Sequence, residues 1–145
     1  MKSDKTLEYL LDQDGMTLNK HHKILRIGIM SYENFQKYTI AIAKGEYKRK
    51  PNEPKLWFTS LQSLANVLSE ENQKLLRLIT DEHPQSISEL ESLTGRNANN
   101  ILRTLRTMEN YGLVELLESK EKKRGRPSLI PRVLFNTTDI QIHFA

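Results

Sequence analysis

Between residues 69 and 111 the apolar positions recur at helical spacing in three successive stretches, which predicts three consecutive helices. The first stretch carries Leu75, Leu76, Leu78 and Ile79. The second opens at Ser86, with Glu89 three residues later, and this spacing is typical of a capped helix start. We expect the inner face of the second helix to consist of Ile87, Leu90 and Leu93.

The third helix is predicted from Asn97 to Tyr111, after a turn at Gly95. Its apolar stripe is expected to face the core and comprises Ile101, Leu105 and Met108, with Leu102 beside them. Gly112 ends the helix, and an extended run, a basic loop and a second run around Pro131, suited to an edge strand, follow it. Three helices, a hairpin strand and a basic loop form the sequence outline of a winged helix-turn-helix, a module that usually binds double-stranded DNA.

Residues 23–59 show a different pattern, which predicts a strand, a helix and a second strand. Apolar residues alternate with other residues over positions 25–29, as they do in a strand. Ser31 is placed to cap a helix that runs to about Lys44, with Gly45 as its stop. The apolar stripe of this helix comprises Phe35, Tyr38 and Ile42. A basic, turn-rich linker leads to a short extended run at residues 55–59, and Ser60 is placed to cap a further helix.

These elements predict an α+β protein, a winged helix-turn-helix with an N-terminal strand–helix–strand extension. We divide the chain into a poorly specified segment, 1–22, a strand–helix–strand dimerisation or partner region, 23–59, and a winged helix-turn-helix DNA-binding domain, 60–145. Near the C-terminus the positions of Ile140, Ile142 and Phe144 alternate as in a strand. Short isolated strands leave polar edges open, so we expect the strand-like runs outside the hairpin to pair with one another, within or between chains.

Composition and motifs argue against several classes of protein. The chain has 145 residues, of which 37% are hydrophobic and 28% charged, and no apolar run approaches the ~18–20 residues that span a bilayer. Its start lacks the apolar stretch of a secretory signal. There is no cysteine, and the four histidines are scattered apart from one adjacent pair. Neither a glycine-rich phosphate loop nor a nucleophile–base pair is recognisable. We therefore expect a cytoplasmic protein that has no cofactor and is not an enzyme.

Positive charge is concentrated in one part of the chain. The net charge is +4, but residues 69–94 hold two basic and six acidic groups, whereas residues 95–132 hold nine basic and four acidic groups. The predicted third helix and the loop after it thus carry the positive excess. Such an asymmetry is the electrostatic footprint of a surface that binds polyanions. The alternative is a solubilising surface on which charges cluster by chance.

The third helix carries a second, polar stripe, which comprises Asn99, Arg103, Arg106 and Asn110. Arginine can donate two hydrogen bonds to guanine, and asparagine can bind the edge of adenine. A helix in the major groove contacts bases mainly through its N-terminal residues, so we expect base contacts early in the helix and a phosphate contact at Arg106. The predicted DNA-binding residues are Arg96, Asn97, Ala98, Asn99, Asn100, Arg103, Thr104 and Arg106. The alternative is an ordinary solvated helix face.

The loop after the third helix contains the sequence Arg124-Gly125-Arg126-Pro127, which resembles the core of an AT-hook. Glycine lets the backbone press into a narrow groove, while flanking arginines enter the negative potential of an A·T-rich minor groove. The predicted DNA-binding residues of this wing are Lys120, Lys122, Lys123, Arg124, Gly125 and Arg126. A charged hairpin that makes only phosphate contacts is the alternative.

Two resemblances bear on function. Three segments between Ser86 and Val114 resemble MarR-like winged-helix regulators, namely Ser86-Ile87-Ser88-Glu89-Leu90, Thr94-Gly95-Arg96-Asn97 and Tyr111-Gly112-Leu113-Val114. Most of residues 23–145 are also similar to a family of small prokaryotic DNA-binding proteins, through residues 41–46, 54–60 and 75–79. The genes of that family often lie beside a small toxin gene, so the resemblance implies an antitoxin role. The three asparagines at the start of the third helix replace its usual serine-rich turn, and the target sequence does not carry over.

The leading hypothesis is a homodimeric, sequence-specific regulator that binds double-stranded DNA, represses its own operon and acts as the antitoxin of a cognate toxin protein. A winged-helix module that binds other proteins and has lost specific DNA binding is the alternative. The lysines and arginines of the predicted wing favour the first hypothesis.

Overall fold

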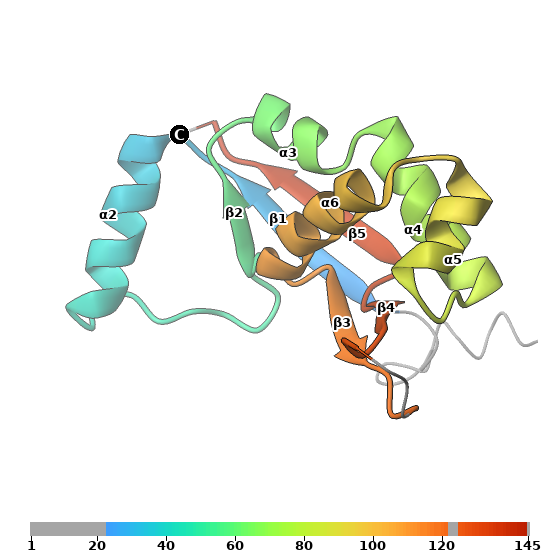
Figure 1. The fold of residues 1–145 in the computed structure, drawn as a ribbon. Helices are drawn as coiled ribbons and strands as arrows, with labels where there is room; N and C mark the ends of the chain where they lie inside the picture. Colours follow the sequence, from blue (N-terminus) through green and yellow to red (C-terminus); the bar gives the residue numbers. More distant parts are fainter. Residues whose placement is uncertain (1–22, 122–124, 145) are drawn as a thin grey trace, which may run out of the picture. The chain divides into compact units, whose positions relative to one another are not determined.

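The structure is a computed structural model that describes residues 23–121 and 125–144, and it belongs to the α+β class, as predicted (Figure 1). The chain divides into two compact units. The first unit comprises Met1–Leu64 and Phe135–Ala145, and the second comprises Ala65–Leu134. Helix α3 (Leu61–Val67) crosses the boundary, and the Oγ of Ser60 accepts a hydrogen bond from the N–H of Ser63, so Ser60 caps this helix as predicted.

The first unit is built on a three-stranded parallel sheet. Strand β1 (Ile24–Ile29) lies between β2 (Leu56–Phe58) and β5 (Thr137–Ile142), and Ile27 of β1 aligns with Leu56 on one side and Ile140 on the other. The prediction that these strand-like runs pair with one another is confirmed, and the pairing is within one chain. It also explains a difference from our predicted division of the chain. Residues 135–145 were expected in the same domain as the three helices, but β5 returns them to the first unit.

One face of this sheet requires a glycine in its central strand. A Cβ added to Gly28 would lie 2.2 Å from the Cζ3 atom of Trp57, because the indole ring of Trp57 reaches from β2 across β1. On the far side the same indole meets His143 edge-on, with the ring centroids 5.2 Å apart. The ring of Trp57 therefore bridges the sheet at a point where only glycine leaves room for it.

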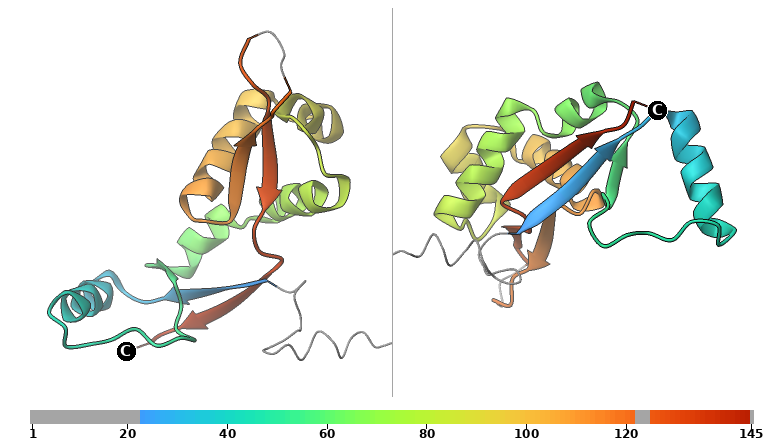
Figure 2. Two further views of the ribbon diagram at one scale, coloured as in Figure 1. Left: turned by 90° about the horizontal axis from the view of Figure 1, so that it is seen from below. Right: turned by 180° about the vertical axis from the view of Figure 1, so that it is seen from behind.

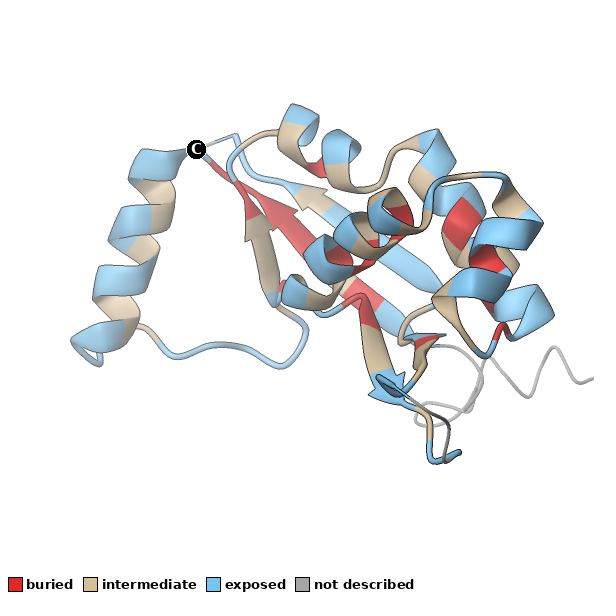
Figure 3. Cartoon of the chain, viewed as in Figure 1, coloured by how far each residue is buried: buried red, intermediate tan, exposed pale blue. Residues whose placement is uncertain are grey.

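Helix α2 (Tyr32–Ala43) attaches to this face through aromatic rings. Its N-terminus is capped as predicted, since the Oγ of Ser31 accepts a hydrogen bond from the N–H of Asn34. No residue of α2, all of which the structure describes, is buried (Figure 3). The centroid of the Tyr38 ring lies 5.4 Å from that of Trp57, so a ring of α2 contacts a ring of the sheet.

The second unit contains α4 (Glu70–Glu82), α5 (Ile87–Thr94), α6 (Ala98–Asn110), β3 (Val114–Glu118) and β4 (Leu129–Val133). Helix α6 packs against α5 and β3, and α4 packs against β4 (Figure 2). The apolar stripe predicted for the third helix is confirmed, because Ile101, Leu105 and Met108 are all buried. Other residues of the same core are Leu75, Ile79, Pro84, Leu90, Leu113, Val114 and Pro131.

The prediction that Leu93 lies on the inner face of α5 is wrong. Leu93 is 45% exposed, and Thr94 is the half-buried residue at this end of the helix. The hydroxyl of Thr94 donates to the carbonyl of Leu90 and accepts from the N–H of Arg96. Hydrogen bonds of Thr94 thus orient the end of α5, and this orientation does not depend on burial of Leu93.

The hairpin of β3 and β4 places a proline where it costs no hydrogen bond. Leu116 of β3 lies opposite Pro131 of β4, and the N–H of Leu116 donates to Glu109 of α6, at 3.4 Å, instead of to β4. The pair is therefore a position at which the strands exchange no hydrogen bonds, so the absent N–H of proline is not missed. The predicted edge-strand character of this run is confirmed. None of the described helices is long and apolar enough to cross a membrane.

The contact between Gly28 and Trp57 yields a first prediction. Gly28→Ala should destabilise the protein by about 1–3 kcal/mol, because the added methyl group overpacks the site below the indole. In a chain that carries Trp57→Leu, the same substitution should cost less than about 1 kcal/mol. Urea unfolding followed by circular dichroism measures both values. An equal cost in the two backgrounds would contradict this account of the glycine.

Candidate functional site

The turn between α5 and α6 positions the polar stripe of the third helix. Three residues, 95–97, connect the two helices, and Gly95 has a φ of 75°, which is in the left-handed region. Its N–H donates to the carbonyl of Glu91 at 2.9 Å and so ends α5. Glycine adopts this backbone conformation without a steric penalty, which makes the sharp turn possible.

The N-terminus of α6 is closed by side chains from both sides of this turn. The Oδ1 of Asn97 accepts hydrogen bonds from the N–H groups of Asn99 at 2.8 Å and Asn100 at 3.3 Å. The N–H of Ala98 donates to the Oε2 of Glu91 at 3.2 Å. Asn97 therefore acts as the helix cap, and Glu91 connects α5 to the start of α6. The side chain of Asn97, which we predicted to contact DNA, is occupied by this role.

Three other predicted residues form a network along one side of α6. The guanidinium of Arg96 donates to the Oδ1 of Asn100, with the Nη2 atom at 2.6 Å, and to the Oγ1 of Thr104 at 3.2 Å. All three residues are half-buried. Both acceptors are neutral, so the network fixes the position of the Arg96 side chain while its positive charge stays uncompensated by them. From the sequence we predicted that Asn100 contacts bases directly, and we did not predict this network.

The exposed stripe of α6 offers a different set of groups. Asn99, Arg103 and Arg106 are all exposed. The Nη1 of Arg106 is 3.0 Å from the Oε1 of Glu109, which forms an ion pair one turn later on the same helix. The side chains of Asn99 and Arg103 have no hydrogen-bond or ion-pair partner among the described residues. Arg103 is therefore a cationic group on this stripe that is available to a ligand.

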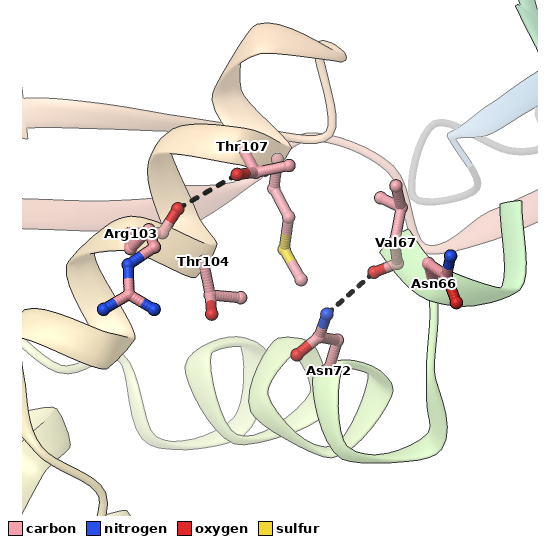
Figure 4. A pocket seen from close by; sticks show the side chains of 7 residues that line it. Asn66, Val67, Asn72, Arg103, Thr104 and Thr107 are labelled. Atoms are coloured by element: carbon pink, nitrogen blue, oxygen red, sulfur yellow. Dashed lines mark hydrogen bonds between the residues drawn. The ribbon is translucent and has the colours of Figure 1, made fainter. Parts of the chain in front are cut away.

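A pocket of about 270 Å³ lies beside Arg103, within the second unit (Figure 4). Its lining comprises Asn66, Val67, Asn72, Arg103, Thr104, Thr107 and Met108. Part of this lining is fixed by hydrogen bonds, since the Nδ2 of Asn72 donates to the carbonyl of Val67 and the Oγ1 of Thr107 donates to the carbonyl of Arg103. The pocket joins side chains from three helices, so no pattern local to one stretch of sequence predicts it.

The hairpin loop carries the predicted wing residues. Lys120, Gly125 and Arg126 are exposed, and Gly125 has a φ of 84°. A hydrogen bond from the N–H of Ser119 to the carbonyl of Ser128 closes the base of the loop. The remaining predicted residues, Lys122, Lys123 and Arg124, lie outside the residues that the structure describes. Three of the four residues of the AT-hook-like sequence, Gly125, Arg126 and Pro127, thus lie on an exposed loop, and the backbone conformation at Gly125 favours glycine.

These arrangements provide cations and amide groups but no metal-binding cluster. Over residues 23–121 and 125–144, no three side chains of histidine, aspartate or glutamate gather as metal ligands would. The surface of α6 offers hydrogen-bond donors and positive charge. A ligand that matches these groups is anionic and rich in hydrogen-bond acceptors.

Comparison with protein families finds a match to part of the chain. Residues 67–130 match the model of the HVO_A0114 family, a segment that begins at the end of α3 and ends within β4. This part of the chain, nearly the whole second unit, is therefore similar to that family, whose designation names no activity. No curated protein and no solved structure matches the chain.

Proposed function

We propose that the protein is a sequence-specific transcriptional regulator that binds double-stranded DNA, and that its second unit is a winged helix-turn-helix. The observation that carries this proposal is the division of polar groups on α6. Arg96, Asn97 and Asn100 are used within the protein, whereas the neighbouring side chains of Asn99 and Arg103 are exposed and have no partner among the described residues. The remaining exposed cation of the stripe, Arg106, forms an ion pair with the carboxylate of Glu109.

The chemistry of the exposed stripe fits the major groove. An arginine can donate to the O6 and N7 atoms of guanine together, and an asparagine can bind the N6 and N7 atoms of adenine. Both Asn99 and Arg103 lie in the first half of α6, the part of a recognition helix that contacts bases. Because the ion pair with Glu109 reduces the positive charge that Arg106 offers, Arg106 suits a weaker phosphate contact at the edge of the interface.

The hairpin loop fits a second groove. Gly125 and Arg126 are exposed, and a loop with these residue types suits an A·T-rich minor groove, whose narrow walls attract arginine. In this proposal α6 binds a short specific sequence while the loop prefers an A·T-rich flank. Such a binding protein needs no catalytic group, so we propose no enzymatic activity.

The first unit supports a symmetric dimer. β5 forms one edge of its sheet, and three apolar residues at or next to this edge are exposed, with Phe144 at 96%, Ile142 at 46% and Ile140 at 44%. An open, apolar strand edge is a template for pairing with another chain. Regulators of this class commonly bind two half-sites as two-fold symmetric dimers, and we infer that this edge forms the dimer contact.

The proposal for α6 predicts that two arginines of one stripe differ in effect. Arg103→Ala should weaken binding to a duplex from the protein's own promoter by about 1–3 kcal/mol and weaken binding to a random duplex less. Arg106→Ala, the matched control, should change both affinities by a smaller and similar amount. Anisotropy titrations of labelled duplexes measure these affinities. Equal losses on both duplexes for Arg103→Ala would make it a phosphate contact.

The hairpin loop supplies a second prediction, which concerns the preferred DNA sequence. Arg126→Ala should leave the preferred core sequence unchanged and reduce the preference for A·T-rich flanks. Selection of binding sites from a random DNA pool reveals both properties. If no variant and no parent protein binds promoter DNA at low salt, the proposed function is wrong.

The proposed dimer contact can be tested with exposed positions. Replacing Ile142 and Phe144 by lysine should convert the dimer into a monomer, because charges on a strand edge oppose pairing. Leu93→Lys, at an apolar position of the second unit that is about as exposed as Ile142, should leave the dimer intact. Sedimentation velocity distinguishes the two states. A doubly substituted chain that still sediments as a dimer would exclude this edge as the contact.

The antitoxin role and its toxin partner rest on the family resemblance alone, and they require a genetic test. We expect a short gene beside the gene of this protein whose expression alone stops growth. Co-expression of this protein should restore growth, and Arg103→Ala should restore it equally well if the DNA-binding helix is not the surface that binds the toxin. Colony counts measure the rescue. An adjacent product that is harmless alone would remove the antitoxin role while leaving DNA binding untouched.

A further inference from the structure

The connection between α2 and β2, residues 44–55, carries a dense group of cations, and we call it the basic loop. Its five basic residues are all exposed, and they are Lys44, Lys48, Arg49, Lys50 and Lys55. The loop contains only two carboxylates, those of Glu46 and Glu53, and therefore has a net charge of +3. Among the described residues, none of the five cations forms an ion pair. From the sequence we predicted residues 48–54 of this segment to be a linker.

The carboxylate of Glu53 has a structural role in this loop. It accepts hydrogen bonds from the hydroxyl of Tyr38 at 2.5 Å, from the hydroxyl of Tyr47 at 2.7 Å and from the N–H of Lys50 at 3.1 Å. Partial burial alone would raise the pKa of Glu53, but these hydrogen bonds outweigh burial and lower it. Glu53 thus remains ionised at neutral pH, and its oxygens are engaged by three donors of the loop and of α2.

Hydrogen bonds between backbone groups also hold the loop in place at both of its ends. At its start, the N–H groups of Glu46 and Tyr47 donate to the carbonyl of Ala41. At its end, the N–H of Lys55 donates to the carbonyl of Arg26 in β1. The ring of Tyr47 lies 5.7 Å from the ring of Tyr38. The cations of the loop therefore extend from a preformed backbone, which lowers the conformational entropy lost when a ligand binds.

We propose that the basic loop binds the phosphate backbone of double-stranded DNA, as a third contact element in addition to α6 and the hairpin loop. This inference rests on the proposed function and deepens it. The basic loop holds five cations within twelve residues, three of them consecutive, Lys48, Arg49 and Lys50. Such a series of positive charges matches the repeating negative charge of a duplex backbone. Such contacts position a protein on DNA and carry no sequence information.

Two other polyanions fit the basic loop less well. Stable binding to an anionic membrane surface usually combines cations with exposed apolar groups, and the exposed large apolar residues of the described chain include none from residues 44–55. Binding to single-stranded nucleic acid uses exposed aromatic rings on which bases stack. The rings of Tyr38, Tyr47 and Trp57 are half-buried and pack against one another. A cluster of cations that has neither exposed large apolar residues nor exposed aromatic rings among its residues fits the phosphate backbone of a duplex best.

The test replaces Lys48, Arg49 and Lys50 by alanine in the full chain. Affinities for a promoter duplex and a random duplex of equal length are measured at several salt concentrations between about 50 and 200 mM. The slope of log K against log salt is negative, and each lost phosphate contact reduces its magnitude by about 0.9, so the magnitude should fall by up to about 2.7. Affinity for both duplexes should fall by the same factor, which leaves the specificity ratio unchanged. The control replaces Lys23, Lys37 and Lys74, three exposed lysines that are not clustered, and should change the slope by less than about 1.

The outcomes separate this proposal from the proposed function. A slope equal to that of the parent protein on both duplexes overturns the proposal for the basic loop, even if Arg103→Ala abolishes specificity. A reduced slope in a protein that binds promoter and random duplexes equally supports the loop and contradicts sequence-specific regulation. If vesicles that contain phosphatidylserine bind the parent but not the triple variant, and duplexes bind both equally, the loop is a membrane contact and the proposal is wrong.

Discussion

The parallel pairing of β1 with β5 is the constraint on which the architecture depends. Residues 24–29 pair with residues 137–142, so the first unit completes its sheet only after the chain has passed through the whole second unit. The second unit is thus an insertion whose two ends both continue into the first. Non-local pairing of this kind forms slowly, because the two ends of the long intervening segment must come together before any contact between the strands stabilises the pair. Local contacts dominate the second unit, whose helices and hairpin follow one another directly.

Much of the local structure could be predicted from the sequence, because helix starts are encoded within a few residues. Ser31, Ser60, Ser86 and Asn97 each cap the helix that follows. The α+β class and the pairing of the strand-like runs were predictable as well. The parallel arrangement, the return of β5 to the first unit and the pocket beside Arg103 were not, because each brings together residues far apart in the chain. Periodicity contains no information on which distant segment pairs with which.

The candidate site shows the same limit at the level of single side chains. Helical spacing correctly separated the apolar stripe of α6 from its polar side. It could not distinguish polar groups that hold the protein together from those that remain available. Arg96 and Asn100 satisfy each other, whereas Arg103, on the neighbouring stripe, has no such partner among the described residues. Similarly, composition identified residues 48–54 as a basic linker. It could not show that Glu53 is held by two tyrosines, Tyr38 and Tyr47, which lie outside this linker.

The position of Trp57 has a spectroscopic consequence. It is the sole tryptophan of the chain and lies in the first unit, between the ring of Tyr38 and the imidazole of His143. The second unit contains one aromatic residue with a phenol, Tyr111, and no indole. Emission excited at the red edge of the absorption band therefore comes from the first unit alone, whereas far-ultraviolet ellipticity is dominated by the helices of the second. The two units carry separate optical signals without the addition of any label.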